Sequence, residues 1–410
     1  MNGRFWSNVA SVLSGTAVAQ LIPIIGSLAL ARLYAPAAFG AYSVWLGFVL
    51  ILAVVATLRL EMALVVVEDG APRDEAATLV LVTVLLVGVA GGILLAVAWW
   101  AGYVLTEIRS AALFGAVVLA AMMTASSDSW QNWAASNGQY RALIRIRVTQ
   151  AFAIVAGQLA AAAIAPTTEM LVLGHVVGLA FALIVAFWHL PAVRPKLPGL
   201  GRRLWTFWVS HRRFPVFALP ADAINTISAQ LPMLVVSSRF GAESAGHLAL
   251  TMRVLGAPIG LLGRSVLDVF RRHAADAFRR TGSCRPEYLS TLKVLALGSV
   301  GLIVGVMLFA RPIFDIAFGP QWEMSATMAM WLVPLFALRF VASPLSYVFY
   351  IVGKQNVDLV WQVALLGVVS AALWLSQSLE QALFAYSYGY SAMYVVYLAV
   401  SFRFSKGKRA

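Results

Sequence analysis

Apolar stretches of about twenty residues recur along the chain, and each is bounded by glycine, proline or charged residues. A helix rises about 1.5 Å per residue, so about 20 apolar residues span the roughly 30 Å hydrocarbon core of a membrane. We expect an all-α polytopic membrane protein with about 12 transmembrane helices. The pattern predicts these helices near residues 9–32, 39–60, 76–102, 111–135, 148–165, 170–190, 215–239, 244–269, 289–310, 323–351, 358–376 and 381–402.

The composition supports this fold class. Hydrophobic residues make up 61% of the 410 residues and charged residues only 11%, whereas soluble domains carry about 25% charged residues. So few charges do not cover a water-exposed surface of this size, which excludes a soluble globular protein. The single cysteine, Cys284, excludes an internal disulfide and a cysteine-based metal cluster.

The formal net charge of +13 depends on where the 30 Lys and Arg residues lie. Most of them fall in alternate loops and in the last residues of the chain, and the loops on the opposite side hold only Arg32, Arg109, Arg239 and Arg311. Basic residues concentrate on the cytoplasmic side of membrane proteins. The alternation predicts both termini in the cytoplasm, and it explains the net charge without a nucleic-acid partner.

The first apolar helix has an alternative interpretation as a cleaved signal peptide. The Ala-Leu-Ala triplet at 29–31 resembles a cleavage site. Gln20 and Pro23 interrupt the apolar run, however, so we expect this helix to stay uncleaved as the first span.

The two halves of the chain resemble each other. An Ala-Gln-Leu triplet at 19–21 precedes Arg32, and the same triplet at 229–231 precedes Arg239. Parallel repeats of this kind are typical of transporters that move two lobes around a central site, and chance similarity between apolar sequences is the alternative.

This repeat predicts the domain organisation. We expect an N-terminal lobe at 1–192, a cytoplasmic linker at 193–214, and a C-terminal lobe at 215–410 that ends in a basic cytoplasmic tail. The linker mixes basic residues with aromatic ones. Such a segment suits either an interfacial helix on the anionic inner leaflet or a simple tether.

Enzymatic chemistry finds little support in the sequence. The external loops are short, and no zinc-protease, CxxC, P-loop or dinucleotide-binding motif occurs. The five histidines are scattered singly. We therefore expect no catalytic residue, no metal site and no cofactor.

Four arginines fall inside predicted helices, where an ionisable side chain costs several kcal/mol unless it faces a cavity or a partner. They are Arg59, Arg253, Arg264 and Arg339. Arg253 and Arg264 are eleven residues apart, which places them on one helix face about 16 Å apart along the axis. This spacing predicts a cationic, water-filled cavity, although Arg264 and Asp268 also have the spacing of an ion pair. Arg339 lies on a polar helix face, which again favours a cavity.

Two polar stripes fall in the fourth and seventh predicted helices. Asp128 and Asn132 share one face of the fourth helix, and Asp222 and Asn225 share one face of the seventh. Carboxylates and amides at membrane depth suit a glycan-lined cavity. Hydrogen bonding between neighbouring helices is the alternative.

Further features predict packing. Arg59 and Glu61 are two residues apart, so we expect them to point in different directions and to reach the membrane surface separately. Pro258 predicts a kink, and the tyrosines at 386–397 suggest packing and a membrane-interface belt. Glycine pairs four residues apart predict close helix approach at 174/178, 256/260 and 301/305.

Several motifs resemble those of oligosaccharide-lipid flippases of the Wzx type. They are SGTAVAQLIP at 14–23, ARLYAPAAFG at 31–40, LRLEMA at 58–63, RFPVFALP at 213–220, AQLP at 229–232, FGPQW at 318–322 and SPLS at 343–346. These motifs follow the expected order over nearly the whole chain. The sequence is thus identified as similar to the polysaccharide biosynthesis proteins of the multidrug/oligosaccharidyl-lipid/polysaccharide exporter superfamily.

This resemblance implies two six-helix lobes that form a V around a polar lumen. It also implies movement of an undecaprenyl-pyrophosphate-linked glycan from the cytoplasmic to the periplasmic leaflet of the bacterial inner membrane, for O-antigen, capsule or exopolysaccharide synthesis. The implied partners are the polyprenyl-linked glycan and membrane lipids, with the polysaccharide polymerase and the chain-length regulator as candidate protein partners.

A pyrophosphate needs cations in a cavity of low dielectric constant, and Arg253, Arg339 and Arg264 are the candidates. Asp128, Asn132, Asp222 and Asn225 are the candidates for glycan contacts. Two other functions stay open. One is a multidrug or small-solute exporter of the same fold, and the other is a membrane glycan polymerase or ligase, which the short external loops disfavour.

Overall fold

The computed structural model describes residues 3–102, 110–189 and 198–407, and every regular element in these ranges is a helix. The chain separates into two compact units, Met1–Gln230 and Leu231–Ala410. The predicted linker at 193–214 precedes this division, and its part from residue 198 onward belongs to the first unit.

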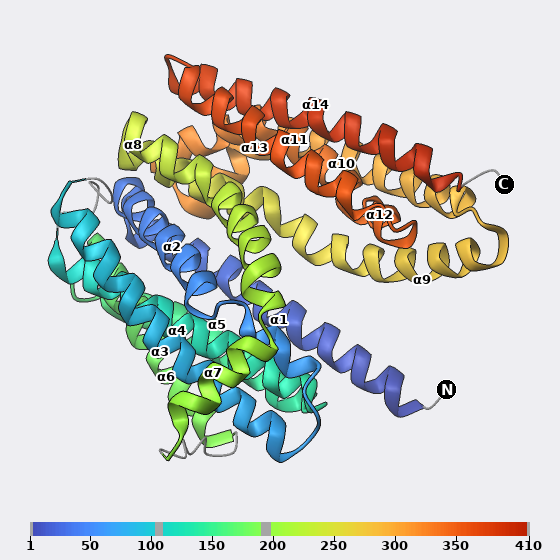
Figure 1. Cartoon of the computed structure of the whole chain (residues 1–410). Helices are drawn as coiled ribbons and strands as arrows, with labels where there is room; N and C mark the ends of the chain where they lie inside the picture. The colour runs from blue at the N-terminus through green and yellow to red at the C-terminus, as the bar shows by residue number, and fades with distance from the viewer. Residues whose placement is uncertain (1–2, 103–109, 190–197, 408–410) are drawn as a thin grey trace. The chain divides into compact units, whose positions relative to one another are not determined.

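The described part of the first unit contains six long helices and the beginning of a seventh (Figure 1). In chain order these are α1 (Gly3–Leu33), α2 (Pro36–Ala56), α3 (Ala71–Trp100), α4 (Ala111–Ser136), α5 (Tyr140–Ala162), α6 (Thr168–His189) and the first part of α8 (Leu219–Pro258). Shorter helical segments join them: the 3₁₀ helix η1 (Leu60–Val65), helix α7 (Leu200–Ser210) and the π-helical turn η2 (Phe214–Ala218).

The second unit contains the rest of α8 and the C-terminal helices (Figure 1). They are the π-helical turn η3 (Ile259–Gly263), α9 (Arg264–Thr281), α10 (Arg285–Phe318), the 3₁₀ turn η4 (Pro320–Trp322), α11 (Glu323–Leu345), α12 (Val348–Ile351), α13 (Gln355–Leu375) and α14 (Leu379–Ser405). Helices α10, α11, α13 and α14 pack side by side.

The predicted membrane spans correspond to these helices. Within the described ranges, nine helices are long and apolar enough to cross a membrane. Helix α1 covers the first predicted run, and η2 with the first part of α8 covers the seventh. The eighth begins in the second part of α8 and continues through η3 into α9. The all-α polytopic membrane fold is therefore confirmed.

Helix α8 is divided at Gly241, where the predicted seventh and eighth spans meet. The φ of 87° and ψ of 163° at this residue suit only glycine. Just before the break, Nη1 of Arg239 donates to the carbonyl of Leu373 at 2.6 Å. Arg32 occupies the matching position one residue before the end of α1. Both arginines thus lie in the last turn before a helix end or break, and the internal repeat stays a prediction.

The predicted kink at Pro258 coincides with the end of α8. The π-helical turn η3 follows and leads into α9, in which Phe270 and Ala274 are buried while Arg271 and Arg272 are exposed. The eighth predicted span, 244–269, is therefore not one continuous helix, because its last part belongs to amphipathic α9.

The glycine pairs differ in their packing. A Cβ added to Gly174 would lie 2.5 Å from the carbonyl oxygen of Gly157, and one added to Gly178 would lie 2.3 Å from that of Ala153. Helices α5 and α6 therefore touch along their backbones, as predicted. A Cβ added to Gly301 or Gly305 would meet no described atom within 4 Å, so the prediction is wrong for that pair.

Helix α7, in the connection between the predicted lobes, packs on α3. Phe207 is buried in the core of the first unit, and Nε1 of Trp208 donates to Oγ1 of Thr83 at 2.9 Å. Arg203 pairs with Glu75 at 2.7 Å. The connection thus contains a docked helix, and its position at a membrane surface stays a prediction.

Candidate functional site

The chain leaves α2 through two residues in the left-handed region. Leu58 has a φ of 50° and Arg59 a φ of 57°. The backbone nitrogen of Arg59 donates to Oγ1 of Thr57 at 3.1 Å, which helps to hold the turn. Left-handed backbone costs about 1–2 kcal/mol per non-glycine residue, so the surrounding contacts must favour this conformation. The turn then redirects the chain into η1.

This turn places Arg59 between two carboxylates. Nη1 of Arg59 lies 2.8 Å from Oε1 of Glu61, and Nε lies 2.7 Å from Oδ2 of Asp222 in the first turn of α8. Glu61 is 2% exposed. Our expectation that Arg59 and Glu61 point in different directions is wrong, because it assumed one continuous helix through both residues.

A third carboxylate belongs to the same neighbourhood. Asp128 is exposed on α4 and interacts electrostatically with Glu61, Arg59 and Arg147. The turn after α2, the middle of α4, the start of α5 and the start of α8 therefore share one group of charges.

Hydrogen bonds between α4 and α5 support this group. Oγ of Ser127 donates to Oε1 of Gln150 at 2.6 Å, and Nε2 of Gln131 lies 3.3 Å from both of these oxygens. Nε of Arg147 donates to Oε1 of Gln131 at 2.9 Å. The side chains next to Asp128 on α4 therefore form hydrogen bonds to the neighbouring helix α5, which is the role that the sequence analysis gave as the alternative to glycan contact.

The two predicted amides lie apart from these bonds. Nδ2 of Asn132 donates to the backbone carbonyl of Asp128 at 2.9 Å, within its own helix. Asn225 is exposed on α8, one turn after Asp222. Asp128 and Asn225 are the more accessible of the four predicted glycan contacts.

In the second unit, Arg339 lies exposed on α11. It forms no hydrogen bond or ion pair with any residue that the structure describes, and it interacts electrostatically with Tyr386, Tyr390 and Tyr394 of α14. The rings of these tyrosines also pack on one another along α14, which agrees with the predicted packing role.

Two contacts show that the second part of α8 runs parallel to α11. Oγ1 of Thr251 donates to the carbonyl of Ser325 at 2.9 Å, and a Cβ added to Gly256 would lie 3.9 Å from Cε1 of Phe336. Arg253 precedes Gly256 by three residues, and Arg339 follows Phe336 by three. At about 1.5 Å per residue, the Gly256 contact places Arg339 about 9 Å further along the axis than Arg253, and the Thr251 contact places it about 18 Å further. The side chains of Arg264 and Asp268 lie outside the described part of the structure.

A buried carboxylate that the sequence analysis did not single out lies in the first turn of α13. Asp358 is 7% exposed. Its Oδ1 accepts from the Tyr397 hydroxyl, and its Oδ2 accepts from Nε2 of Gln362 at 3.0 Å and from the Tyr350 hydroxyl at 3.5 Å. These three neutral donors join α12, α13 and α14.

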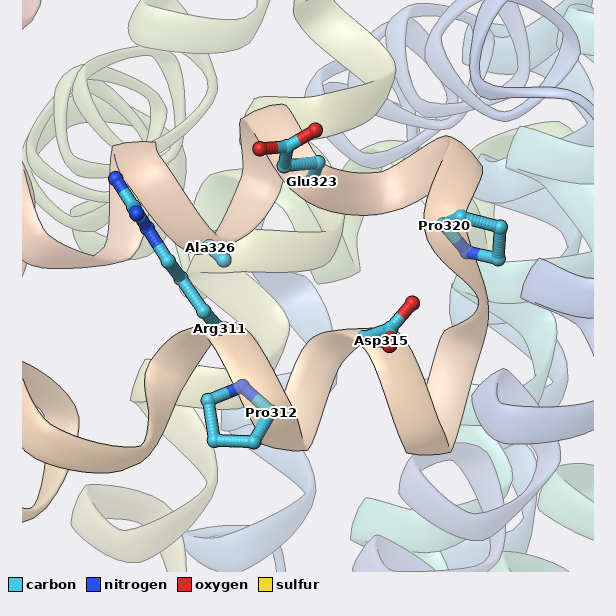
Figure 2. A pocket seen from close by; sticks show the side chains of 6 residues that line it. All are labelled: Arg311, Pro312, Asp315, Pro320, Glu323 and Ala326. Carbon is cyan, nitrogen blue, oxygen red and sulfur yellow. The ribbon is translucent and has the colours of Figure 1, made fainter.

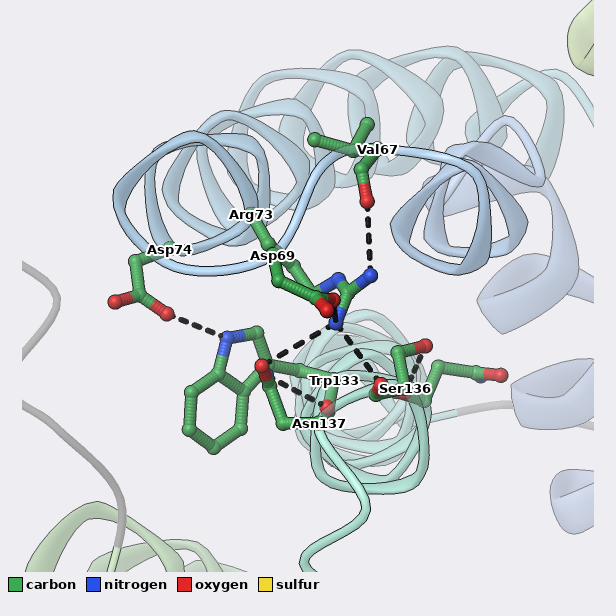
Figure 3. A network of polar contacts seen from close by, with 8 residues as sticks. Val67, Asp69, Arg73, Asp74, Trp133, Ser136 and Asn137 are labelled. Carbon is green, nitrogen blue, oxygen red and sulfur yellow. Dashed lines mark hydrogen bonds and ion pairs between the residues drawn. The ribbon is translucent and has the colours of Figure 1, made fainter.

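Arg73, in the first turn of α3, is a buried structural residue (Figure 3). Its Nη1 donates to the carbonyl of Ser136 at 2.9 Å, and its Nη2 donates to the carbonyl of Val67 at 2.8 Å. Asp69 forms an ion pair with it. Arg73 thereby fixes the segment after η1 to the end of α4, which carries Asp128.

The turn between α10 and α11 holds a pocket of about 250 Å³ (Figure 2). Arg311 and Asp315 of α10 and Glu323 of α11 line it. This pocket mixes both signs of charge at the helix ends, whereas Arg253 and Arg339 lie in the interior of their helices.

Comparison with known sequences identifies the family. Residues 29–327 match the profile of the family described as polysaccharide biosynthesis protein, well over half of the 410 residues. The chain belongs to this family. The family suggested by the sequence motifs is thereby confirmed.

One curated relative of this polysaccharide biosynthesis protein is the teichuronic acid biosynthesis protein TuaB of Bacillus subtilis (strain 168). The two are 22% identical over 152 residues, which are 36% of this chain and 31% of TuaB. The matched region thus spans about a third of the length of that relative.

Solved structures share the fold of this family member. The lipid II flippase MurJ in an inward closed conformation matches with a TM-score of 0.75 at 13% identity, over 96% of this chain and 87% of MurJ. The MATE multidrug transporter DinF-BH matches with a TM-score of 0.62 at 13% identity, over 97% and 94% of the two chains. The protein is therefore a multi-pass membrane protein with the exporter fold.

Arg59, which the sequence analysis placed among the packing features, forms two ion pairs in the charged group of the first unit. Its signal was present, since Arg59 and Glu61 lie together in the LRLEMA motif at the end of a predicted span. Left-handed residues other than glycine have no sequence marker, so the turn that pairs them was not predictable.

Proposed function

We propose that this protein is a flippase, not an enzyme, that moves a polyprenyl-pyrophosphate-linked oligosaccharide across the bacterial inner membrane. Transport runs by alternating access from the cytoplasmic to the periplasmic leaflet and supplies cell-surface polysaccharide synthesis. The observation that carries this proposal is a pair of arginines, Arg253 and Arg339, in the interior of helices of a polysaccharide biosynthesis family member.

The two arginines suit a pyrophosphate. An arginine at membrane depth costs several kcal/mol unless it meets a cavity or an anion, and arginine binds phosphate oxygens through two parallel hydrogen bonds. The two residues lie on helices that run in the same direction, about 9–18 Å apart along the axis, so they place two cations along the path of one anionic headgroup. Arg264, which directly follows η3 on the same chain segment, is the third candidate.

The charged group of the first unit suits the glycan. The Asp128 carboxylate and the Asn225 amide are exposed and accept or donate hydrogen bonds to sugar hydroxyls. Asp222 is paired with Arg59, and Asn132 is hydrogen-bonded within its own helix. Each therefore contacts the glycan through the polar atoms that these bonds leave free. The polyprenyl chain stays in the lipid phase beside the helices.

The test is depletion of the protein followed by measurement of the lipid-linked glycan in each leaflet. We expect the glycan to accumulate in the cytoplasmic leaflet, out of reach of an impermeant periplasmic labelling reagent. An unchanged distribution between leaflets would overturn the flippase proposal. Accumulation in the periplasmic leaflet would instead identify a polymerase or ligase.

The second candidate function is export of a drug or small solute. The likeness to DinF-BH, a multidrug transporter, is the observation that favours it. The same depleted cells distinguish the two, because an exporter predicts retention of a cationic dye with a normal distribution of lipid-linked glycan.

A further inference from the structure

A second cationic feature lies at the end of the second unit, apart from Arg253 and Arg339 in chain position. A pocket of about 550 Å³ lies between the C-terminal end of α14 and the turn that joins α9 to α10. It is lined by Ser283, Arg285, Arg403, Lys406 and Gly407. All of its charged lining residues are cations, and all three are exposed.

The pocket has a fixed frame. The backbone nitrogen of Cys284 donates to the carbonyl of Ser405 at 2.9 Å, and Oγ of Ser283 donates to the same carbonyl at 3.1 Å. Gly407 has a φ of 72°, and a Cβ there would lie 1.7 Å from the carbonyl oxygen of Gly282. The two backbone segments are thus in direct contact, as the nearby ends of α14 and α9 show in Figure 1.

The Phe402 ring contacts two of the three cations, Arg285 and Lys406. The guanidinium carbon of Arg285 lies 5.3 Å from the centre of the Phe402 ring, and Nζ of Lys406 lies 5.5 Å from it. The ring itself packs on Tyr288, with 5.7 Å between centroids. Cation–π contacts hold a charge beside the ring without neutralising it. Both cations therefore keep their charge for a ligand.

No protein carboxylate neutralises the pocket within the described part of the chain. Arg285, Arg403 and Lys406 form no ion pair with a described residue. Glu287, in the first turn of α10, interacts electrostatically with Cys284 and does not line the pocket. The pocket at the other end of α10 differs, because there Asp315 and Glu323 accompany the arginine (Figure 2).

We propose that this pocket binds the phosphate group of an anionic phospholipid headgroup. It lies at the end of α14, a candidate membrane span, which is the level of lipid headgroups. The distribution of basic residues predicts that this end is cytoplasmic, where anionic lipids attract clustered Lys and Arg. The volume lies within the usual range of about 300–1,000 Å³ for small-ligand sites.

A bound headgroup joins two parts of the second unit. The α14 end supplies Arg403 and Lys406, and the α9–α10 turn supplies Arg285. Helix α9 continues through η3 into the helix that carries Arg253. The lipid site is therefore independent of the proposed transport substrate, although it stabilises an element connected to the arginine that we assign to that substrate.

The experiment is a titration of the delipidated full-length protein with phosphatidylglycerol, followed by native mass spectrometry. We expect tighter binding of phosphatidylglycerol than of phosphatidylcholine. Replacing the three pocket cations (Arg285→Gln, Arg403→Gln, Lys406→Gln) should weaken phosphatidylglycerol binding by roughly 100-fold, since each cation near an anionic surface contributes about a fivefold factor.

The matched control removes three exposed arginines outside the pocket and outside the 193–214 connection (Arg141→Gln, Arg145→Gln, Arg311→Gln). It lowers the net charge equally and should leave phosphatidylglycerol binding nearly unchanged. An equal loss in this control, or equal binding of phosphatidylcholine, would overturn the proposal. Displacement of the lipid by millimolar inorganic phosphate would also overturn it, because the site would then serve a soluble anion.

Thermal unfolding shows whether the triple variant is folded. If it does not fold, the single variants Arg403→Gln and Lys406→Gln replace it, each with an expected loss of roughly fivefold. Unchanged binding in both single variants would contradict the proposal. The flippase proposal is tested by the leaflet assay and the phospholipid site by the lipid titration. Because the two measurements are separate, one proposal can fail while the other holds.

Discussion

Nε of Arg59 lies 2.7 Å from Oδ2 of Asp222, and this ion pair connects the left-handed turn after α2 to the first turn of α8. Arg59 simultaneously pairs with Glu61, which is almost fully buried. The two bonds of Arg59 therefore differ in environment, since 37% of the Asp222 side chain is exposed and only 2% of the Glu61 side chain. We therefore expect unequal losses of folding stability when Arg59 and when Asp222 is replaced.

Arg59→Ala should destabilise the protein by about 2–3 kcal/mol, because it leaves the buried Glu61 carboxylate without its cation. Asp222→Asn should cost under about 1 kcal/mol, since the bond it removes is partly exposed to solvent. Thermal unfolding of the purified protein in detergent measures both. Equal losses in the two variants would contradict the role of Glu61.

Gly174→Ala should weaken the contact between α5 and α6. The added Cβ would lie 2.5 Å from the Gly157 carbonyl oxygen and 2.7 Å from Cα of Gln158, and helix backbone yields little, so we expect a loss of about 1–3 kcal/mol. The matched control is Gly301→Ala in α10, where the Cβ meets no described atom within 4 Å. There the better helix propensity of alanine should give a small gain in stability.

The Cys284 thiol predicts a pH dependence of stability. Burial raises its pKa from 9.0 to about 11, and the negative charge of Glu287 contributes to the same rise. An acid whose pKa is higher in the folded protein stabilises folding fully below its unfolded pKa, and this contribution is lost as the pH rises through the folded value. Between pH 9 and pH 11 the wild type should therefore lose more stability than Cys284→Ala. Parallel curves for the two proteins would show that the thiol does not contribute.

How far the sequence predicts this protein depends on the kind of feature. Apolar runs locate the helices because each run must cross the membrane, and Arg253 and Arg339 stand out because charge at that depth is costly. The pairing of Arg59 depends on a left-handed turn of ordinary residues, which leaves no pattern in the sequence. Gly301 and Gly305 have the spacing of a packing motif, but no described atom lies within contact distance of them.

The hydrogen bonds of Asp358 were also not predictable from the sequence. Its donors come from α12, α13 and α14 and are up to 39 residues away in the chain, so only the packing of these helices brings them together. Their convergence on one buried carboxylate gives a further prediction.

Asp358→Asn should destabilise the second unit by about 1–3 kcal/mol, because the amide nitrogen presents a donor where the structure supplies only donors. Adding Tyr397→Phe removes one of the opposed donors and should restore part of the loss. Asp276→Asn, which changes a partly exposed carboxylate of α9, is the control and should have little effect. Additive losses in the double variant would mean that Tyr397 and Asp358 act separately.

The proposed pyrophosphate site makes the sharpest functional prediction. Arg339→Ala should reduce transport of the lipid-linked glycan by more than about tenfold, because a charge-assisted, two-bond contact to phosphate contributes about 1.5–3 kcal/mol. Arg339→Lys keeps the charge but loses the planar two-bond geometry, so it should recover only part of the activity. Arg253→Ala should resemble Arg339→Ala, whereas Arg311→Ala, at the end of α10, should transport normally. Each variant is measured by the leaflet distribution of the glycan, with its membrane level determined in the same cells. Normal transport by both Arg253→Ala and Arg339→Ala at normal levels would remove these residues from the substrate site.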